Sequence, residues 1–508
     1  MSQATAGGAR VPRAELFVHV TGKLRKEREI VMEMKNGQTT NPLATERISR
    51  LIAKFARPSI ISMLVSSLYN IVDQIFIGQG VGMLGNAATN IAFPISIICT
   101  ATALLLGIGS ASNFNLESGA GRKEEAVRIA GTGLSMLVIC GCIIAVIVLL
   151  FLNPLLQLFG VTPEVLPFAQ DYTGITAWGI PFLVLTTGGN HLIRADRSPT
   201  YSMTCMLTGA IINTILDPLF IFGFHWGIQG AAWATVIGQV ISGMMVIFYF
   251  AKRCNMELKA EMLIPRGHAL KAIVSLGMAS CINQISMAVV QIVMNNTLRH
   301  YGAMSMYGTD IPLACVGVIS KVNMVFMAIC IGISQGCQPI WGFNYGAENY
   351  GRVRETYRKA ATVSLMVGIV FFGCFQTFPR QLVSIFGTGS EAYFYFAERY
   401  FKIYMFMTFI NGIQPMSSGF FTSIGKARLG IVVSLTRQVL FLLPLIVIFP
   451  IFMGIDGVMY AGPIADGASA AVAVGFALRE LKIMRTAEEG IMTEKKNGGN
   501  SYADRSNG

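Results

Sequence analysis

Apolar residues run in long stretches along the chain, separated by short polar segments, from about residue 58 to residue 480. Many stretches reach about eighteen residues, which lets a helix cross a hydrocarbon layer about 30 Å thick. The pattern predicts an all-α, polytopic membrane protein. About twelve transmembrane helices are expected, at approximately 58–78, 87–114, 127–152, 168–192, 200–222, 228–251, 272–298, 311–338, 358–378, 396–422, 429–453 and 457–480.

The composition agrees with this pattern. Of the 508 residues, 53% are hydrophobic and 13% are charged, whereas soluble domains have about 25% charged residues. Nine of the ten cysteines lie in apolar segments, without a CxxC pair or a spacing that would indicate a disulfide framework. The composition therefore excludes a water-soluble globular protein.

The formal net charge is +12, and the distribution of the basic residues along the chain indicates the membrane topology. Lys and Arg gather in the tails and in the loops predicted on one side, and they form no patch interleaved with aromatic residues, so nucleic acid is not an expected partner. The loops of the other side contain only Arg299, Arg380 and Arg399. By the positive-inside rule, we expect a multi-pass protein of the plasma (inner) membrane with both termini in the cytoplasm.

The two halves of the chain repeat at a fixed offset of 227 residues. Gly109 is matched by Gly336, and the run Gly227 to Gly230 is matched by Gly454 to Gly457. Six helices per repeat give two lobes that enter the membrane in the same sense, as in secondary transporters. The expected division is 1–57, a disordered cytoplasmic tail; 58–251, the N-lobe; 252–271, a cytoplasmic linker; 272–480, the C-lobe; and 481–508, a second cytoplasmic tail.

Ionisable residues inside membrane helices are costly, so each is a candidate functional residue. In the first half, Asp73, Asn213, Asp217 and Thr235 are predicted at similar depth. Their oxygen atoms suit Na⁺, and the two carboxyl groups equally suit a shared proton. The alternative is a purely structural role, in which Asp217 caps a kinked helix end and Asp73 accepts a hydrogen bond from a backbone or side-chain donor.

The second half offers a different set of polar residues. Lys321, Arg437 and Asp466 are predicted inside helices, with Lys321 and Asp466 at matching depth, which favours an ion pair over a role in gating or substrate binding. Amides also interrupt these helices, where they either line a wet cavity or hydrogen-bond neighbouring helices. The amides are Asn283, Gln284, Gln291, Gln338, Asn411 and Gln414.

Several motifs together resemble the multidrug and toxic compound extrusion (MATE) family, and its MepA-like branch in particular. They are Leu68 to Asp73, Asn213 with Leu216-Asp217-Pro218, Gly230-Ala231-Ala232 leading to Thr235, Arg194-Ala195-Asp196, Gly332 to Gly336 and Asn344 to Ala347. The resemblance covers roughly residues 50–480. It implies two six-helix lobes that form a V and that exchange H⁺ or Na⁺ for amphipathic, often cationic, drugs.

Carried over by motif, the family's first-lobe cation site falls on Asp73, Asn213, Asp217 and Thr235, and its bending proline falls on Pro58. One departure concerns the second lobe, where some relatives have acids that hold a cation. This chain has Met294, Asn295 and Asn296 near one of those positions. We therefore do not expect coupling through the second lobe.

The predicted function is a secondary active multidrug exporter, and not an enzyme, with no cofactor and no metal beyond Na⁺ at the first-lobe site. Its expected partners are small drug-like molecules and the lipid bilayer, and the expected state is a monomer. Two alternatives stay open. One is a flippase of lipid-linked precursors, and the other is a membrane-embedded enzyme, although the five histidines are scattered and form no HExxH motif.

Overall fold

The computed structural model describes residues 41–385 and 390–503, with side chains described up to residue 490. The chain divides into two compact units at Arg47. In the first, the short helix α2 (Pro42–Thr45) begins after Asn41, whose side-chain oxygen accepts a hydrogen bond from the Leu43 amide at 3.1 Å. The second unit, from Ile48 onward, holds the helices that are long enough to cross a membrane.

The N-lobe of this second unit contains eight α-helices. They are α3 (Ile48–Gly80), α4 (Met83–Gly119), α5 (Lys123–Leu150), α6 (Leu152–Leu158), α7 (Leu166–Thr176), α8 (Ile180–Ala195), α9 (Pro199–Pro218) and α10 (Gly227–Lys252). The linker contains one 3₁₀ turn at Ala260–Leu263.

The C-lobe follows the linker. Its helices are α11 (Gly267–Ala303), α12 (Asp310–Gly346), α13 (Tyr350–Thr377), α14 (Pro379–Ser384), α15 (Glu391–Tyr404), α16 (Thr408–Asn411), α17 (Ile413–Ser423), α18 (Ala427–Leu435), α19 (Leu443–Met453) and α20 (Ile455–Ala503). No strand occurs in the described parts of the chain, so the all-α prediction is confirmed.

Ten helices are long and apolar enough to span a membrane in the described residues. The two remaining predicted spans, 168–192 and 396–422, occur as interrupted helices. A 3₁₀ turn at Ala177–Gly179 separates α7 from α8, and turns separate α15, α16 and α17. The two interruptions lie in corresponding places of the 227-residue repeat, so both lobes have six spans.

The outer limits of the helical region differ from the prediction. Helix α3 begins at Ile48 rather than at residue 58, and α20 continues past residue 480 to Ala503, so both predicted tails are partly helical. At the start of α3, Leu51, Ile52 and Phe55 are buried on one face while basic residues occupy the other. Such an amphipathic segment forms a helix, but its mean hydropathy is too low for it to be recognised as part of a membrane span. Residues 1–40 of the predicted tail lie outside the described residues.

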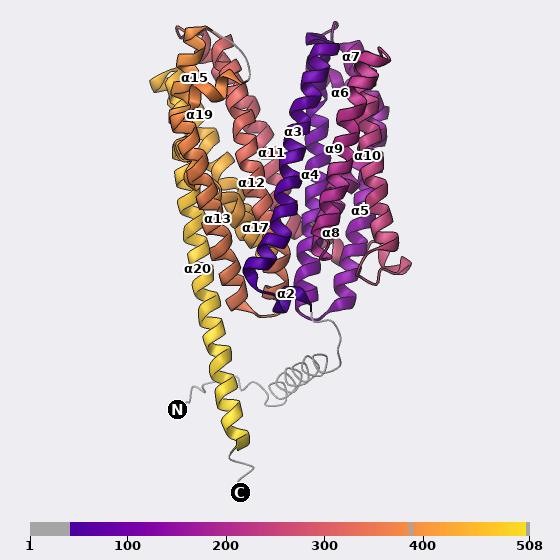
Figure 1. The fold of residues 1–508 in the computed structure, drawn as a ribbon, viewed down its shortest axis with the longest axis vertical. Coiled ribbons are helices and arrows are strands. Elements are labelled where there is room, and N and C mark those ends of the chain that lie inside the picture. The colour runs from indigo at the N-terminus through magenta and orange to yellow at the C-terminus, as the bar shows by residue number, and fades with distance from the viewer. Residues whose placement is uncertain (1–40, 386–389, 504–508) are drawn as a thin grey trace, which may run out of the picture. The chain divides into compact units, whose positions relative to one another are not determined.

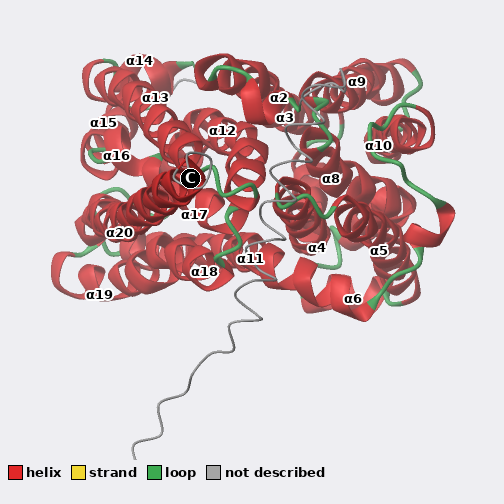
Figure 2. Ribbon diagram, turned by 90° about the horizontal axis from the view of Figure 1, so that it is seen from below, coloured by secondary structure: helices red, strands yellow, loops and turns green. Residues whose placement is uncertain are grey.

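Within the second unit, the helices form two groups, with α3 and α4 beside α12 and α11 (Figures 1 and 2). The groups approach each other near the ends of α4 and α12 and diverge toward the opposite end, as the V-shaped arrangement requires (Figure 1). A Cβ atom on Gly119 would lie 2.0 Å from the Phe343 carbonyl oxygen, and one on Gly346 would lie 2.1 Å from that of Leu116. Gly119 corresponds to Gly346, and Leu116 to Phe343, at the 227-residue offset of the repeat. The two contacts are therefore equivalent, with the glycine of each lobe packed against the backbone of the other.

Glycine allows equally close contact between α4 and α11. A Cβ atom on Gly277 would lie 1.7 Å from the Leu105 carbonyl oxygen. We expect Gly277→Ala to force these helices apart and to lower the free energy of unfolding by about 1–3 kcal/mol. Thermal unfolding in detergent measures the change, with Gly317→Ala as the control because a Cβ atom there meets open space. Equal unfolding midpoints for Gly277→Ala and wild type would contradict the packing described.

Candidate functional site

Four polar residues of the N-lobe meet between three helices. Asp73 comes from α3, Asn213 and Asp217 from α9, and Thr235 from α10. Helix α9 packs against both of the others. Asp217 is fully buried, Asp73 and Asn213 are less than one-tenth exposed, and Thr235 is half-buried. The structure therefore places together the four residues that the sequence placed at one depth.

Asn213 is the centre of this cluster. Its Nδ2 donates to Asp217 Oδ1 and to Thr235 Oγ1, both at 3.3 Å. The carboxyl groups of Asp73 and Asp217 lie close enough to interact with each other, and the side chain of Gln74 lies near Asp73. The side chains thus form one connected polar group.

Three oxygen atoms in the cluster are buried without a hydrogen-bond partner among the described residues: Asp73 Oδ1, Asn213 Oδ1 and Asp217 Oδ2. Neither aspartate forms an ion pair with a described Lys or Arg. Two buried carboxyl groups that lie near each other repel when both are ionised, unless a positive charge compensates them. Oxygen atoms in this arrangement can share a proton or coordinate a cation such as Na⁺.

The backbone beside Asp217 departs from an ordinary α-helix. Pro218 follows it directly, and the chain then forms a π-helical turn at Leu219–Gly223. Proline removes one backbone hydrogen bond, and π-helical turns are frequent at functional sites because they loosen the helix locally. Gly230 of α10 packs on this turn, since a Cβ atom there would lie 2.9 Å from the carbonyl carbon of Phe220. The irregular turn therefore begins two residues after Asp217.

The sequence did not identify two tyrosines beside the cluster. Tyr69 precedes Asp73 by four residues on α3, so it lies on the same helical face, and it is close enough to interact with both aspartates. Tyr172 of α7 lies close enough to interact with Thr235 and with both aspartates. Helical spacing could have indicated Tyr69. Tyr172 gave no signal, because a neutral phenol in a membrane helix is common.

Pro58 lies inside α3, close to the place where this helix contacts α12. A Cβ atom on Gly336 would lie 2.5 Å from the Ala56 Cα, and one on Gly332 would lie 2.6 Å from the Ile60 Cα. The Pro58 carbonyl oxygen accepts a hydrogen bond from Ser62 Oγ at 2.8 Å. Pro58 thus lies in the stretch of α3 that contacts α12, and its role as a hinge stays a prediction.

In the C-lobe, the structure pairs Arg437 with Asp466. Arg437 Nε lies 2.6 Å from Asp466 Oδ1, and Asn411 Nδ2 donates to Asp466 Oδ2 at 3.0 Å. Arg437 lies in a second π-helical turn, Thr436–Leu442. Lys321, which the predicted depth matched with Asp466, is exposed and forms no ion pair with a described residue. The match with Lys321 was wrong, because depth does not fix the direction in which a helix points its side chain.

The other amides of the C-lobe have separate environments. Gln414 Nε2 donates to the Val433 carbonyl oxygen at 2.7 Å and so joins α17 to α18. Gln291 is exposed on α11 and donates to Asn295 Oδ1 at 3.0 Å. Gln338 lines a small cavity between the lobes. Asn411 and Gln414 thus form hydrogen bonds to neighbouring helices, whereas Gln338 lines a cavity.

The loop between α8 and α9 is fixed to the linker by one carboxyl group. Asp196 accepts hydrogen bonds from Tyr249 Oη at 2.6 Å and from the Asn255 amide at 2.7 Å. Burial raises the pKa of the Asp196 carboxyl above its usual value, although these hydrogen bonds oppose the shift. Asp196 of the Arg194-Ala195-Asp196 motif therefore holds this loop in place, and it lies far from the N-lobe cluster.

Comparison with known proteins gives consistent matches. The MatE family model matches residues 58–219 and 279–448. The multidrug export protein MepA of Staphylococcus aureus is 25% identical over 447 residues, which cover 87% of this chain and 96% of that protein. MepA of Staphylococcus haemolyticus is 25% identical over 451 residues, covering 88% and 97%.

The fold also matches a solved structure, the outward-facing conformation of a multidrug resistance MATE family transporter of the MOP superfamily. The TM-score is 0.82 at 22% identity, and the match covers 88% of this chain and 100% of that one.

Proposed function

Because the chain belongs to the MatE family of multidrug and toxic compound extrusion transporters, we propose that it is a secondary active exporter that exchanges H⁺ or Na⁺ for amphipathic, often cationic, organic compounds. One observation supports ion coupling most strongly. Asp73 and Asp217 are buried next to each other with unpartnered oxygen atoms. A site of this kind changes its charge and its hydrogen bonding when a cation enters.

In the proposed cycle, the cluster binds H⁺ or Na⁺ when the lobes are open at the end where Asp73 lies. Cation binding removes the repulsion between Asp73 and Asp217 and lets their side chains approach. The π-helical turn after Pro218 is the segment best suited to absorb the resulting shift of α9. Substrate release then accompanies the change in the N-lobe, and the lobes reopen on the other side.

Export of a fluorescent dye from proteoliposomes tests this proposal. An imposed pH gradient alone, or an imposed Na⁺ gradient alone, should sustain uphill dye movement, and the gradient that does so identifies the coupling ion. ATP should have no effect. Dye movement that follows only its own concentration gradient under both conditions would contradict the proposal.

A further inference from the structure

A charged side chain is buried without a counter-charge where the two lobes meet. Arg194, in the last turn of α8, is 3% exposed. Its Nη1 donates to Ser202 Oγ and its Nη2 donates to His191 Nδ1, both at 3.0 Å. Among the described residues, no carboxylate lies within ion-pair distance of the guanidinium. Arg437, by contrast, has 11% of its side chain exposed and has Asp466 beside it.

The surroundings of Arg194 do not balance its charge. Removing a cation from water is costly even after the protein relaxes. The carbonyl dipoles at the end of α8 favour a cation, but they offset only part of that cost. The hydroxyl of Ser202 and the imidazole of His191 satisfy two N–H groups but supply no negative charge. An anion beside the guanidinium would supply it.

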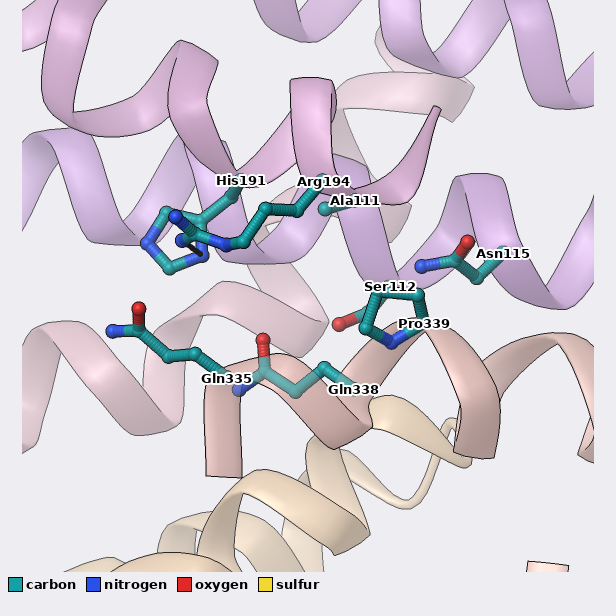
Figure 3. Close-up of a pocket in the computed structure, with 8 residues that line it drawn as sticks. All are labelled: Ala111, Ser112, Asn115, His191, Arg194, Gln335, Gln338 and Pro339. Carbon is teal, nitrogen blue, oxygen red and sulfur yellow. Dashed lines mark hydrogen bonds between the residues drawn. The ribbon is translucent and has the colours of Figure 1, made fainter. Parts of the chain in front are cut away.

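A small cavity adjoins Arg194 and is shared by both lobes. Its walls come from α4, α8 and α12, and it has room for about one water molecule. Figure 3 shows Arg194 and His191 on one side of this space and Gln335 and Gln338 on the opposite side. The remaining lining residues are Ala111, Ser112, Asn115 and Pro339. Among the described residues, no aspartate or glutamate lines the cavity.

The walls of the cavity are rich in hydrogen-bond donors. A guanidinium has only donors, so His191 Nδ1 must accept, and the imidazole proton is on Nε2, which gives a further donor. Gln335 is 8% exposed and its Oε1 has no partner among the described residues. Since amide oxygen and nitrogen can exchange places by a flip, Gln335 and Gln338 can each turn an NH₂ group into the cavity.

We propose that this cavity binds a small monatomic anion of the halide class, held by Arg194 from the N-lobe and by Gln335 and Gln338 from the C-lobe. The limited space favours a halide over a carboxylate or a phosphate group. Because α8 and α12 belong to different lobes, the bound anion joins the lobes at this contact. This site is separate from the Asp73 and Asp217 cluster, and its existence does not depend on which cation drives transport.

Thermal unfolding of the purified protein tests the proposal. Chloride and bromide are titrated against gluconate at constant ionic strength, with acetate as the larger anion. A ligand that binds only the folded state raises the unfolding midpoint in a saturable way. We expect a rise of several degrees with either halide and none with acetate. Crystals grown in bromide should show an anomalous peak between α8 and α12.

Two variants separate specific binding from a general salt effect. Arg194→Gln should abolish the response to halide, whereas Arg197→Gln, which changes an exposed arginine in the adjoining loop, should keep it. Should Arg194→Gln not fold, Gln338→Leu should shift the halide titration to several-fold higher concentration. The proposal is overturned if gluconate or acetate stabilises as well as chloride, if Arg194→Gln keeps the response, or if bromide is absent from this cavity.

Discussion

Replacing Asp217 by Asn, or Asp73 by Asn, should abolish uphill export while leaving insertion and folding intact. Each change keeps the size of the side chain and removes a carboxylate that faces the other one across the cluster. With one cation entering per uncharged substrate molecule, a potential of 100 mV supports about a 50-fold concentration ratio, since it supplies about 2.3 kcal/mol. The variants should reduce this ratio to one.

Dye accumulation ratios in proteoliposomes measure this effect, and Asp310→Asn is the matched control. Asp310 is an exposed acid at the start of α12, outside the N-lobe cluster, so its variant should transport as the wild type does. Fluorescence-detected gel filtration establishes that each variant is folded. A folded Asp217→Asn protein that keeps the wild-type ratio would show that the cluster does not couple transport to an ion.

Breaking the Arg437–Asp466 pair should be the most destabilising single change among the charged residues described here. Asp466→Asn leaves the guanidinium of Arg437 buried, with 11% of the side chain exposed and no anionic partner. Removing one partner of a buried pair typically costs about 3–5 kcal/mol. We therefore expect a large fall in the unfolding midpoint and in the yield of folded protein.

The double variant Arg437→Gln with Asp466→Asn should recover most of that loss, because it removes both buried charges together. The matched control is Asp456→Asn, which breaks the partly exposed pair of Arg399 with Asp456 at 2.8 Å. Exposed pairs contribute about 0–1 kcal/mol, so this control should unfold close to the wild type. A small effect of Asp466→Asn would mean that water or another group compensates Arg437.

The hydrophobic pattern located most membrane helices, because burial in lipid requires long apolar stretches. It failed at the start of α3 and beyond residue 480 in α20, where helices continue with charged residues on one face. It also did not predict the breaks between α7 and α8 or within α15–α17. Hydropathy measures apolar content and is insensitive to a local change of helix type.

The sequence placed Asp73, Asn213, Asp217 and Thr235 at a common depth, and the structure brings their side chains together. In the C-lobe, predicted depth matched Asp466 with Lys321, but Asp466 contacts Arg437 and Lys321 is exposed. The direction in which each helix turns its side chains depends on packing between segments distant in the sequence. Tyr172 escaped detection for the same reason, since only packing places α7 beside α10.

The most direct test of ion coupling at the N-lobe cluster is the reverse flux. Proteoliposomes are given a substrate gradient and no ion gradient, and proton or Na⁺ movement is recorded with a pH-sensitive dye or with radioactive sodium. The wild type should move ions against the direction of substrate flow, and Asp217→Asn should move none. Equal ion movement by the wild type and by folded Asp217→Asn protein would contradict the proposal that Asp73, Asn213, Asp217 and Thr235 form the coupling site.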